Sequence, residues 1–532
     1  MKYIFKIILI SVLFFSCKKE STINSSQNYT DLFLEESTIN SFFKTNPENE
    51  NIVKEVNLFY KNRNFQYAWF TKKGMTQAVS NFQNQLQNYS YDFNDKTFNN
   101  TSLDSLMNKN RIEIDENERE KLELMITTTF FKYSEKAFSG INKNARQLDW
   151  FIPRSKKNYQ VLLDSLILKN KNEKTYEPFN LYYSKLKEKL RLYRNIQKKG
   201  GFPKIKNDNE FLFKNESDSV MLQVKQRLFL SGDLKINDNS ILYTMELANA
   251  ISHFQQRVGL PENGKLDFKT IAEMNKSVDF RIKQMLINLE RLRWVPVKME
   301  NNYLLVNIPE YKLHVFENKK LLWEANVVVG KEAKQTSIFK GNISRIILNP
   351  YWNIPNSIIN KEILPALKRN PNYLSRNNME VVSNTGKIIN ASTINWDKYS
   401  KNVPFIIRQK PDHDNALGKM KFLFPNSFSI YLHDTPAKEL FNQNKRDFSH
   451  GCIRVENPKK LALYLLEKDK NWSQEKVEKV LKTNTETGIS IKPNMPVYIA
   501  YFTAWVDSKG NLNFRNDIYN LDDDLAKEIF VE

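Results

Sequence analysis

The sequence predicts a multidomain protein of the α+β class. The chain has 532 residues, a length that suggests about three domains. Apolar residues recur at helical spacing up to about residue 294, and from Tyr303 onward they alternate with a period of two, which indicates strands. The hydrophobic fraction of 41% is sufficient for ordinary buried cores. We therefore expect a helical N-terminal part followed by a mixed-β domain.

The N-terminus predicts an export signal. Two lysines precede an apolar run over residues 7–15, which is too short to span a bilayer and ends just before Cys17. A small residue before a cysteine resembles the lipobox of bacterial lipoproteins, although Phe14 stands where leucine is usual. We expect residues 1–16 to be removed, Cys17 to carry a lipid, and residues 17–30 to form a polar, flexible tether.

Residues 31–215 predict a helical scaffold domain. The segment is rich in charged and aromatic residues and repeats apolar residues at helical spacing. Trp69 and Trp150 are either core residues or surface binding aromatics, and core packing is the favoured interpretation. No group of catalytic residues is evident in this part of the chain. The helical repeats are Leu122, Leu124, Met125, Phe130 and Phe131, then Leu181, Leu186, Leu190 and Leu192.

A compact pattern within residues 216–277 combines an apolar helix, a Gly-Leu pair, a turn with glycine and a threonine near the start of a last helix. Gly259 is suited to end the first helix in the left-handed conformation, and Thr270 is suited to cap the last one. The pattern resembles the peptidoglycan-binding-domain-one module, which implies a small three-helix fold that binds the cell wall. The matching residues are Phe254, Gln255, Gly259, Leu260, Gly264 and Thr270.

The rest of the chain predicts a linker followed by a β domain. Residues 278–300 form a linker helix, amphipathic over 278–294, with arginine and lysine on its polar face. Residues 301–500 read as strands, interrupted at about 356–402 by an insertion that leans helical. Residues 501–532 end the chain as a further segment that packs on the β domain.

The strongest chemical signal is a single thiol with two histidines nearby in sequence. With the N-terminal cysteine used by the lipid, Cys452 is the one thiol of the mature chain, two residues after His450 and nineteen after His433. His433 follows an alternating run over 428–432 that reads as a strand, which would hold an imidazole rigidly against a thiol on the next loop. Gly451 allows a close backbone approach, and N–H groups there could bind an oxyanion.

Three other interpretations of these residues stay open at this point. A lone cysteine is often a small buried hydrophobe. Two histidines and a cysteine could bind zinc, but only three soft ligands are close in sequence and no CxxC pair exists, so we expect no metal. His450 could fix the loop rather than transfer protons.

The formal net charge of +20 suits nucleic acid, anionic lipid or an acidic polymer. A compositional bias towards lysine would give the same charge without any function. No basic run with interleaved aromatics forms a nucleic-acid patch. The export signal also argues against a nucleic-acid partner, whereas the carboxylates of peptidoglycan would fit a basic surface.

The residues SHGCIRV, with HDTP nineteen residues before the cysteine, resemble the signature of the L,D-transpeptidase (YkuD) family. Residues 415–436 and WNIPNSI upstream resemble its YcbB-like subgroup. The resemblance implies a mixed-β catalytic domain with a helical capping insertion. It implies Cys452 as the nucleophile, His433 as its base and the backbone carbonyl of Asp434 as the group that orients the ring. The other motif positions are Gly451, in the catalytic loop, and Tyr431, Ser449, His450 and Arg454, beside the substrate.

The resemblance also implies the reaction and the partners. We expect 3–3 peptidoglycan cross-links, made through a cysteine thioester from a tetrapeptide donor and a diaminopimelate amine acceptor, without a cofactor. The alternatives are an L,D-carboxypeptidase, in which water resolves the thioester, and a non-catalytic peptidoglycan-binding lipoprotein. We expect the protein in the periplasm, lipid-anchored to a bacterial membrane, the outer one being favoured.

Overall fold

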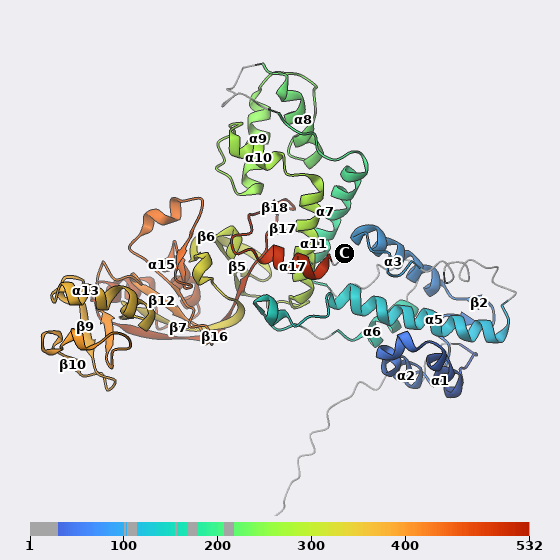
Figure 1. Cartoon of the computed structure of the whole chain (residues 1–532), viewed down its shortest axis with the longest axis horizontal. Coiled ribbons are helices and arrows are strands. Elements are labelled where there is room, and N and C mark those ends of the chain that lie inside the picture. The colour runs from blue at the N-terminus through green and yellow to red at the C-terminus, as the bar shows by residue number, and fades with distance from the viewer. Residues whose placement is uncertain are drawn as a thin grey trace, which may run out of the picture. The chain divides into compact units, whose positions relative to one another are not determined.

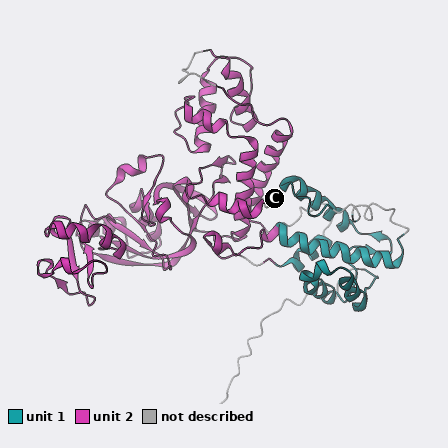
Figure 2. Cartoon of the chain, in the orientation of Figure 1, with its two compact units in different colours: residues 1–137, 158–177 teal, residues 138–157, 178–532 magenta. Residues whose placement is uncertain are grey.

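The computed structural model describes residues 30–99, 103, 114–154, 157–168, 179–206 and 217–530. The chain divides into two compact units, residues 1–137 with 158–177 and residues 138–157 with 178–532 (Figure 2). The predicted signal, Cys17 and all but the last residue of the predicted tether lie outside the described residues. Across the described ranges, no helix combines the length and the apolar character needed to cross a membrane.

The first unit is helical, as the apolar spacing predicts. Trp69 is fully buried and stacks on Phe82 with 5.7 Å between ring centroids, so core packing is confirmed for this tryptophan. The carboxylate of Glu123 is buried beside it and accepts hydrogen bonds from the backbone N–H groups of Ala68 and Trp69. The elements are α1 (Glu36–Thr45), α2 (Val53–Asn62), β1 (Phe70–Thr71), β2 (Gly74–Met75), α3 (Gln77–Phe93), α5 (Glu116–Ser134) and α6 (Tyr159–Ile167).

Three helices in the second unit form a small cluster with its own core, α8 (Val220–Ser231), α9 (Met245–Val258) and α10 (Phe268–Met274) (Figure 1). Gly259 ends α9 with a φ of 74°, as expected. The Gln255 side chain is buried and makes five hydrogen bonds to the turn that precedes α10 and to Thr270. The expectation that Thr270 caps α10 is wrong, because the side chain of Asp267 accepts the hydrogen bond from the Thr270 N–H.

The helix α11 (Val278–Trp294) covers the part of the predicted linker that was expected to be amphipathic, but most of its polar face is buried as well. Its arginines are buried because each finds a carboxylate. Arg281 pairs with Glu273, and Arg291 pairs with Asp522, each with an N–O distance of 2.5 Å. The helix packs on α7 (Leu181–Lys198) and on the C-terminal segment. Charged residues therefore line a buried interface here, because ion pairs compensate for their burial.

A mixed sheet forms the β domain, with the strand order β12-β13-β15-β6-β5-β4-β16-β7-β3 and β14 attached to β6. An additional pairing joins β12 to β7, so the sheet closes on itself. The predicted strands from Tyr303 onward are present, except that the strand expected over 428–432 begins only at Leu432. The bounds are β3 (Trp150–Phe151), β4 (Tyr303–Asn307), β5 (Lys312–Glu317), β6 (Lys320–Gly330), β7 (Ile338–Leu348), β12 (Met420–Leu423), β13 (Leu432–His433), β14 (Asp447–Ser449), β15 (Ile453–Val455) and β16 (Thr487–Ala500).

The insertion between β7 and β12 is a mixed subdomain rather than a helical one. Its apolar residues form a separate core that includes Ile358, Leu367, Val381 and Ile407. A four-stranded sheet with the order β10-β9-β11-β8 packs with the short helices. The elements are β8 (Trp352–Asn353), α12 (Asn356–Ile358), α13 (Leu364–Arg369), α14 (Tyr373–Arg376), β9 (Met379–Val382), β10 (Ile388–Ile389) and β11 (Ile406–Gln409).

The last elements contact both the helices and the sheet of the second unit. They are α15 (Pro458–Leu466), α16 (Gln474–Leu481), β17 (Ala504–Val506), β18 (Leu512–Phe514) and α17 (Leu521–Ile529). The Thr503 backbone N–H donates to the Asn288 side chain of α11 at 2.9 Å. The Tyr519 hydroxyl donates to the Gly330 carbonyl at the end of β6, at 2.5 Å. The segment thus joins α11 to the β domain.

Candidate active site

The strand that carries His433 is shorter than the sequence predicts. A strand over 428–432 was expected, but β13 begins only at Leu432. Ser429 has a φ of 56°, which is left-handed and cannot continue a strand. The Asn426 side chain accepts hydrogen bonds from the backbone N–H groups of Phe428 and Ile430 and holds this turn. The alternating pattern therefore belongs partly to a turn, although His433 still closes the strand.

Three neighbouring strands place the chemistry on one face of the sheet. Lys421 pairs with His433 across β12 and β13, and His433 pairs with Arg454 across β13 and β15. Paired residues of neighbouring strands point to the same face, and residues two apart share a face. Tyr431 and Cys452 therefore lie on this face too, because each is two residues before its counterpart, His433 or Arg454. The residues between them are buried on the other face and include Phe422, Leu432 and Ile453.

His433 is held as a neutral imidazole. Its Nδ1 lies 2.5 Å from the carbonyl oxygen of Asp434, so this nitrogen carries the proton and Nε2 is left as the acceptor. Burial lowers the pKa of His433 to about 3, and the positive charges of Arg454 and Lys421 act in the same direction. The ring is therefore uncharged near neutral pH and can accept a proton from a neighbouring thiol.

Cys452 is only partly buried, in contrast to His433, which is 5% exposed. Its Sγ lies 3.7 Å from the carbonyl oxygen of Ser429. Burial raises the pKa of the thiol, while Tyr431, Lys421 and Arg454 oppose that shift. The sulfur is thus a protonated thiol near neutral pH, and its activation needs a base.

The loop before Cys452 is fixed by hydrogen bonds. The Ser449 hydroxyl donates to the Cys452 carbonyl at 2.6 Å and accepts from the Gly451 N–H at 3.1 Å. The Thr336 hydroxyl donates to the Gly451 carbonyl at 2.8 Å. Gly451 has a φ of 111°, which side chains rarely allow. The backbone N–H groups of His450 and Cys452 donate to no acceptor among the described residues. Both are therefore free to donate a hydrogen bond to a ligand.

The Asp434 side chain fixes the turn after His433. It accepts hydrogen bonds from the backbone N–H groups of Lys419 at 2.9 Å and Thr435 at 2.7 Å, and it forms an ion pair with Lys438. With its carboxylate occupied in this way, Asp434 presents its carbonyl oxygen to the His433 ring.

The remaining predicted residues lie around this face. Tyr431 stands edge-on to His433 with 5.6 Å between ring centroids, and burial raises the pKa of its hydroxyl. His450 is exposed on the loop, and burial of part of its ring together with Lys334 and Lys331 lowers its pKa. Sequence reasoning missed Lys421, because one lysine in a lysine-rich chain carries no signal until the strand register is known.

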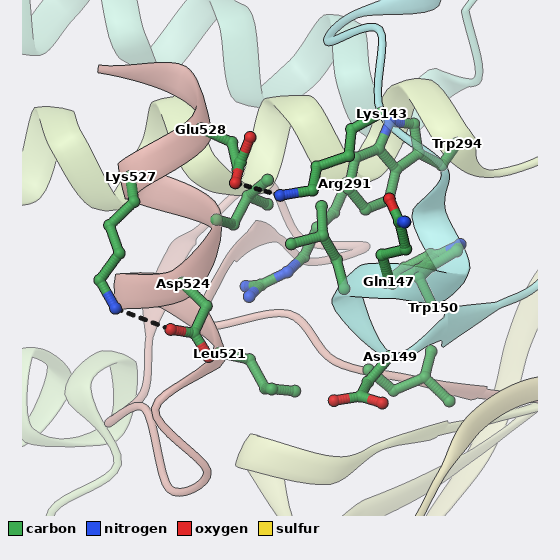
Figure 3. A pocket seen from close by; sticks show the side chains of 13 residues that line it. Lys143, Gln147, Asp149, Trp150, Arg291, Trp294, Leu521, Asp524, Lys527 and Glu528 are labelled. Carbon is green, nitrogen blue, oxygen red and sulfur yellow. Dashed lines mark hydrogen bonds and ion pairs between the residues drawn. The ribbon is translucent and has the colours of Figure 1, made fainter. Parts of the chain in front are cut away.

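A separate cavity of about 210 Å³ lies between α17, α11 and the segment before β3 (Figure 3). Trp150, which is buried, and Trp294 line it together with Arg291. The ion pairs Lys143–Glu528 and Lys527–Asp524 border it. It contains neither the thiol nor His433. No group of three potential ligands for a metal ion occurs within the described part of the chain.

Comparison with known proteins identifies the β domain. Residues 301–489 match the family model of the L,D-transpeptidase catalytic domain, YkuD, and residues 54–190 match the model of a scaffold domain. A curated Haemophilus influenzae protein named "Putative L,D-transpeptidase" is 37% identical over 240 residues, which are 45% of this chain and 48% of that protein. The chain therefore matches about half the length of this relative.

Solved L,D-transpeptidase structures resemble the chain weakly as a whole. That from Xylanimonas cellulosilytica is 12% identical, covers 56% of this chain and 100% of its own, and gives a TM-score of 0.18. That from Stackebrandtia nassauensis is 12% identical, covers 56% and 97%, and gives a TM-score of 0.23. TM-scores this low support no conclusion about the family, so the family of the β domain is inferred from the sequence matches alone. The sequence of residues 301–489 thus matches the YkuD family of L,D-transpeptidase catalytic domains.

Proposed function

We propose that the protein is a cell-wall L,D-transpeptidase that forms 3–3 cross-links through a thioester on Cys452. The observation that carries the proposal is the shared face of β13 and β15, on which a neutral imidazole and a partly exposed thiol occupy consecutive pairs. The family of the domain supports the substrate class, a peptidoglycan stem peptide. The YcbB-like resemblance of residues 415–436 stays a prediction.

Acylation begins with a neutral pair. His433 Nε2 takes the thiol proton as Cys452 Sγ attacks the carbonyl carbon between diaminopimelate and the terminal D-alanine. The backbone N–H groups of Cys452 and His450 stabilise the oxyanion. The C–N bond then breaks, and His433 gives its proton to the departing D-alanine amine. The products are a thioester and free D-alanine.

Deacylation reverses these roles. The side-chain amine of diaminopimelate on a second stem attacks the thioester carbonyl and loses a proton to His433. The C–S bond breaks, and the thiolate of Cys452 recovers that proton. The new amide is the 3–3 cross-link. Because the same two side chains serve both halves, no metal or organic cofactor is required.

Location follows from the N-terminal prediction. We propose that Cys17 anchors the protein to a bacterial membrane, the outer one being favoured, with its body in the periplasm. We propose that α8, α9 and α10, the helices within the 216–277 resemblance, hold peptidoglycan near the catalytic face. The support is the resemblance of the Phe254–Thr270 pattern and the turn that Gln255 stabilises.

The test is incubation of the purified protein with a disaccharide tetrapeptide, followed by mass analysis of the products. We expect a dimer whose mass is the sum of two monomers minus one alanine, and no product with Cys452→Ala. Cross-linking by that variant would defeat the proposal. A tripeptide product in place of the dimer would indicate the carboxypeptidase alternative. Binding to cell walls without any product would indicate the non-catalytic one.

A further inference from the structure

Lys421 lies in the candidate site but has no proton-transfer or nucleophilic role in the thioester chemistry. It pairs with His433 in β12 and β13, and His433 pairs with Arg454 in β15, so two cations flank the imidazole in one row across three strands. Its Nζ lies over the ring of Tyr431, 4.0 Å from the ring centroid. Lys421 therefore points along the same face as the thiol of Cys452.

Lys421 has no anionic partner. Within the described chain its ammonium makes no hydrogen bond and no ion pair, and the charges that act on it, those of the Cys452 thiolate and then of Glu486, do so without a direct bond. The neighbouring lysines differ, since Lys419 donates to the Asn484 side chain at 2.9 Å and Lys438 pairs with Asp434. The ring of Tyr431 gives a cation–π contact but no counter-charge.

Arg454, on the other side of His433, is similarly unpaired. Its Nε is buried without an acceptor in the described residues. The Cys452 thiolate and, more weakly, Glu439 act on its charge, but no carboxylate comes within ion-pair distance. A partly buried cation without a partner is unfavourable, and two on one face make the site favourable for an anion.

We propose that Lys421, with Arg454, binds the free terminal carboxylate of the D-amino acid that leaves the donor stem. The inference rests on the proposed function. In a stem peptide this carboxylate carbon is three covalent bonds from the carbonyl carbon that Cys452 attacks. The Lys421 ammonium lies 4.0 Å from the ring centroid of Tyr431, and the Tyr431 side chain interacts with the Cys452 sulfur, so the ammonium is on the side of the sheet where such a carboxylate would lie. Lys421 thereby selects donors that end in a free carboxylate next to the scissile bond.

The first experiment needs no transpeptidase activity. Iodoacetate and iodoacetamide both alkylate the Cys452 thiolate with loss of iodide, and only iodoacetate carries a carboxylate. Because both reagents sense the same fraction of thiolate, the ratio of their rates reports anion binding beside the sulfur. We expect Lys421→Met to lower the iodoacetate-to-iodoacetamide ratio about tenfold or more, as loss of a charge-assisted hydrogen bond predicts. The exposed lysine Lys509 supplies the control, and Lys509→Met should leave the ratio unchanged.

An equal fall in both alkylation rates would overturn the proposal, because it would mean that Lys421 acts on the thiol pKa alone. Lys421→Arg keeps the charge and should keep most of the ratio. If Lys421→Arg keeps the wild-type ratio and Lys421→Met unfolds at the normal temperature, the fall in the ratio comes from the lost charge and not from a damaged fold.

The second experiment compares a tetrapeptide donor with its C-terminal carboxamide. For the wild type we expect kcat/KM to fall about 10- to 100-fold with the amide, mostly through KM. For Lys421→Met the acid should fall to the level of the amide, and the amide should change little. Equal discrimination in both proteins would assign the carboxylate to other residues. If neither donor is turned over, the proposed function fails while the alkylation ratio still tests Lys421.

Discussion

His433 Nδ1 lies 2.5 Å from the carbonyl oxygen of Asp434, and this contact decides which ring nitrogen can act. A carbonyl can only accept, so Nδ1 must carry the proton and Nε2 must be the base. The pKa of about 3 keeps that base uncharged over the physiological range. Because the pKa of the Cys452 thiol is raised, the resting pair is thiol and imidazole rather than an ion pair.

The first prediction concerns this neutral pair. His433→Ala should slow acylation of Cys452 about 10²- to 10⁴-fold near neutral pH, because no base is left to take the proton. The rate of the variant should rise with pH through the alkaline range as the thiolate forms. Rapid-mixing measurements of thioester formation between pH 6 and 10 check both statements. His413→Ala removes an exposed imidazole as the control, and a profile shared by the two variants would contradict the pairing.

The second prediction concerns Gly451. Gly451→Ala should cost about 1–3 kcal/mol of stability and most of the activity, because its φ of 111° is strained for alanine. Space does not forbid the substitution, since the nearest atom to an added Cβ is the Gln335 carbonyl oxygen at 3.5 Å. Gly386→Ala carries a comparable backbone penalty at a φ of 84° in the insertion, where nothing lies within 4 Å. Equal activity in the two variants would show that the loop conformation is unimportant.

The third prediction concerns pH and His314. Burial opposes the charged ring, but Glu310 and Glu324 at 2.8 and 2.9 Å outweigh it and raise the pKa of His314 to about 9. A raised folded pKa gives stability that is fully present below the ordinary value of about 6.5 and is lost as pH rises through about 9. Burial also opposes the charge of Glu310, whose pKa is nevertheless lowered, chiefly by His314.

Denaturant unfolding at several pH values checks this. We expect the free energy of unfolding to fall by roughly 3 kcal/mol between pH 6 and 10, and His314→Gln to remove that dependence. The exposed His413 again supplies the comparison, since His413→Gln should keep the wild-type slope. An unchanged slope in His314→Gln would place the titration elsewhere.

The fourth prediction concerns the cluster of α8, α9 and α10. Gln255→Ala removes five hydrogen bonds and leaves buried N–H groups of the turn without an acceptor, at a cost of about 2–4 kcal/mol. Gln256→Ala changes the adjacent, exposed residue, which makes a single bond to Glu262. Thermal unfolding and binding to insoluble peptidoglycan should both weaken for the first variant and not for the second. Normal wall binding by Gln255→Ala would argue against this cluster as the wall-binding element.

Periodicity predicted the strands from Tyr303 and the helices α5, α7 and α11 because each buries a regular set of apolar residues. It failed where charge is buried. The arginines of α11 read as a surface face, since a sequence does not reveal that Glu273 and Asp522 meet them. The sequence of the insertion favours helices because its short strands alternate for too few residues to show a period of two.

The candidate site was predictable only where its residues are close together in the sequence. Residues close in sequence, such as Ser449 and Gly451, carry their own signal through the motif. The proximity of His433 and Cys452 was inferred from the family, and its geometry depends on the parallel pairing of β13 and β15. Lys421 belongs to the site only because β12 pairs with β13 in a particular register, and no local sequence pattern predicts that register.

The buried pairs of α11 also bear on how this protein can be divided. Asn288 donates to the Thr503 hydroxyl at 2.7 Å, and Thr503 in turn donates to Asp522, the partner of Arg291. A fragment that starts at residue 301, where the family match begins, would lack Asn288 and Arg291 and would leave the charge of Asp522 without its ion-pair partner. A recombinant catalytic fragment that keeps its fold should therefore include residues from 278, and any exchange of modules between relatives would have to carry this helix with the C-terminal segment.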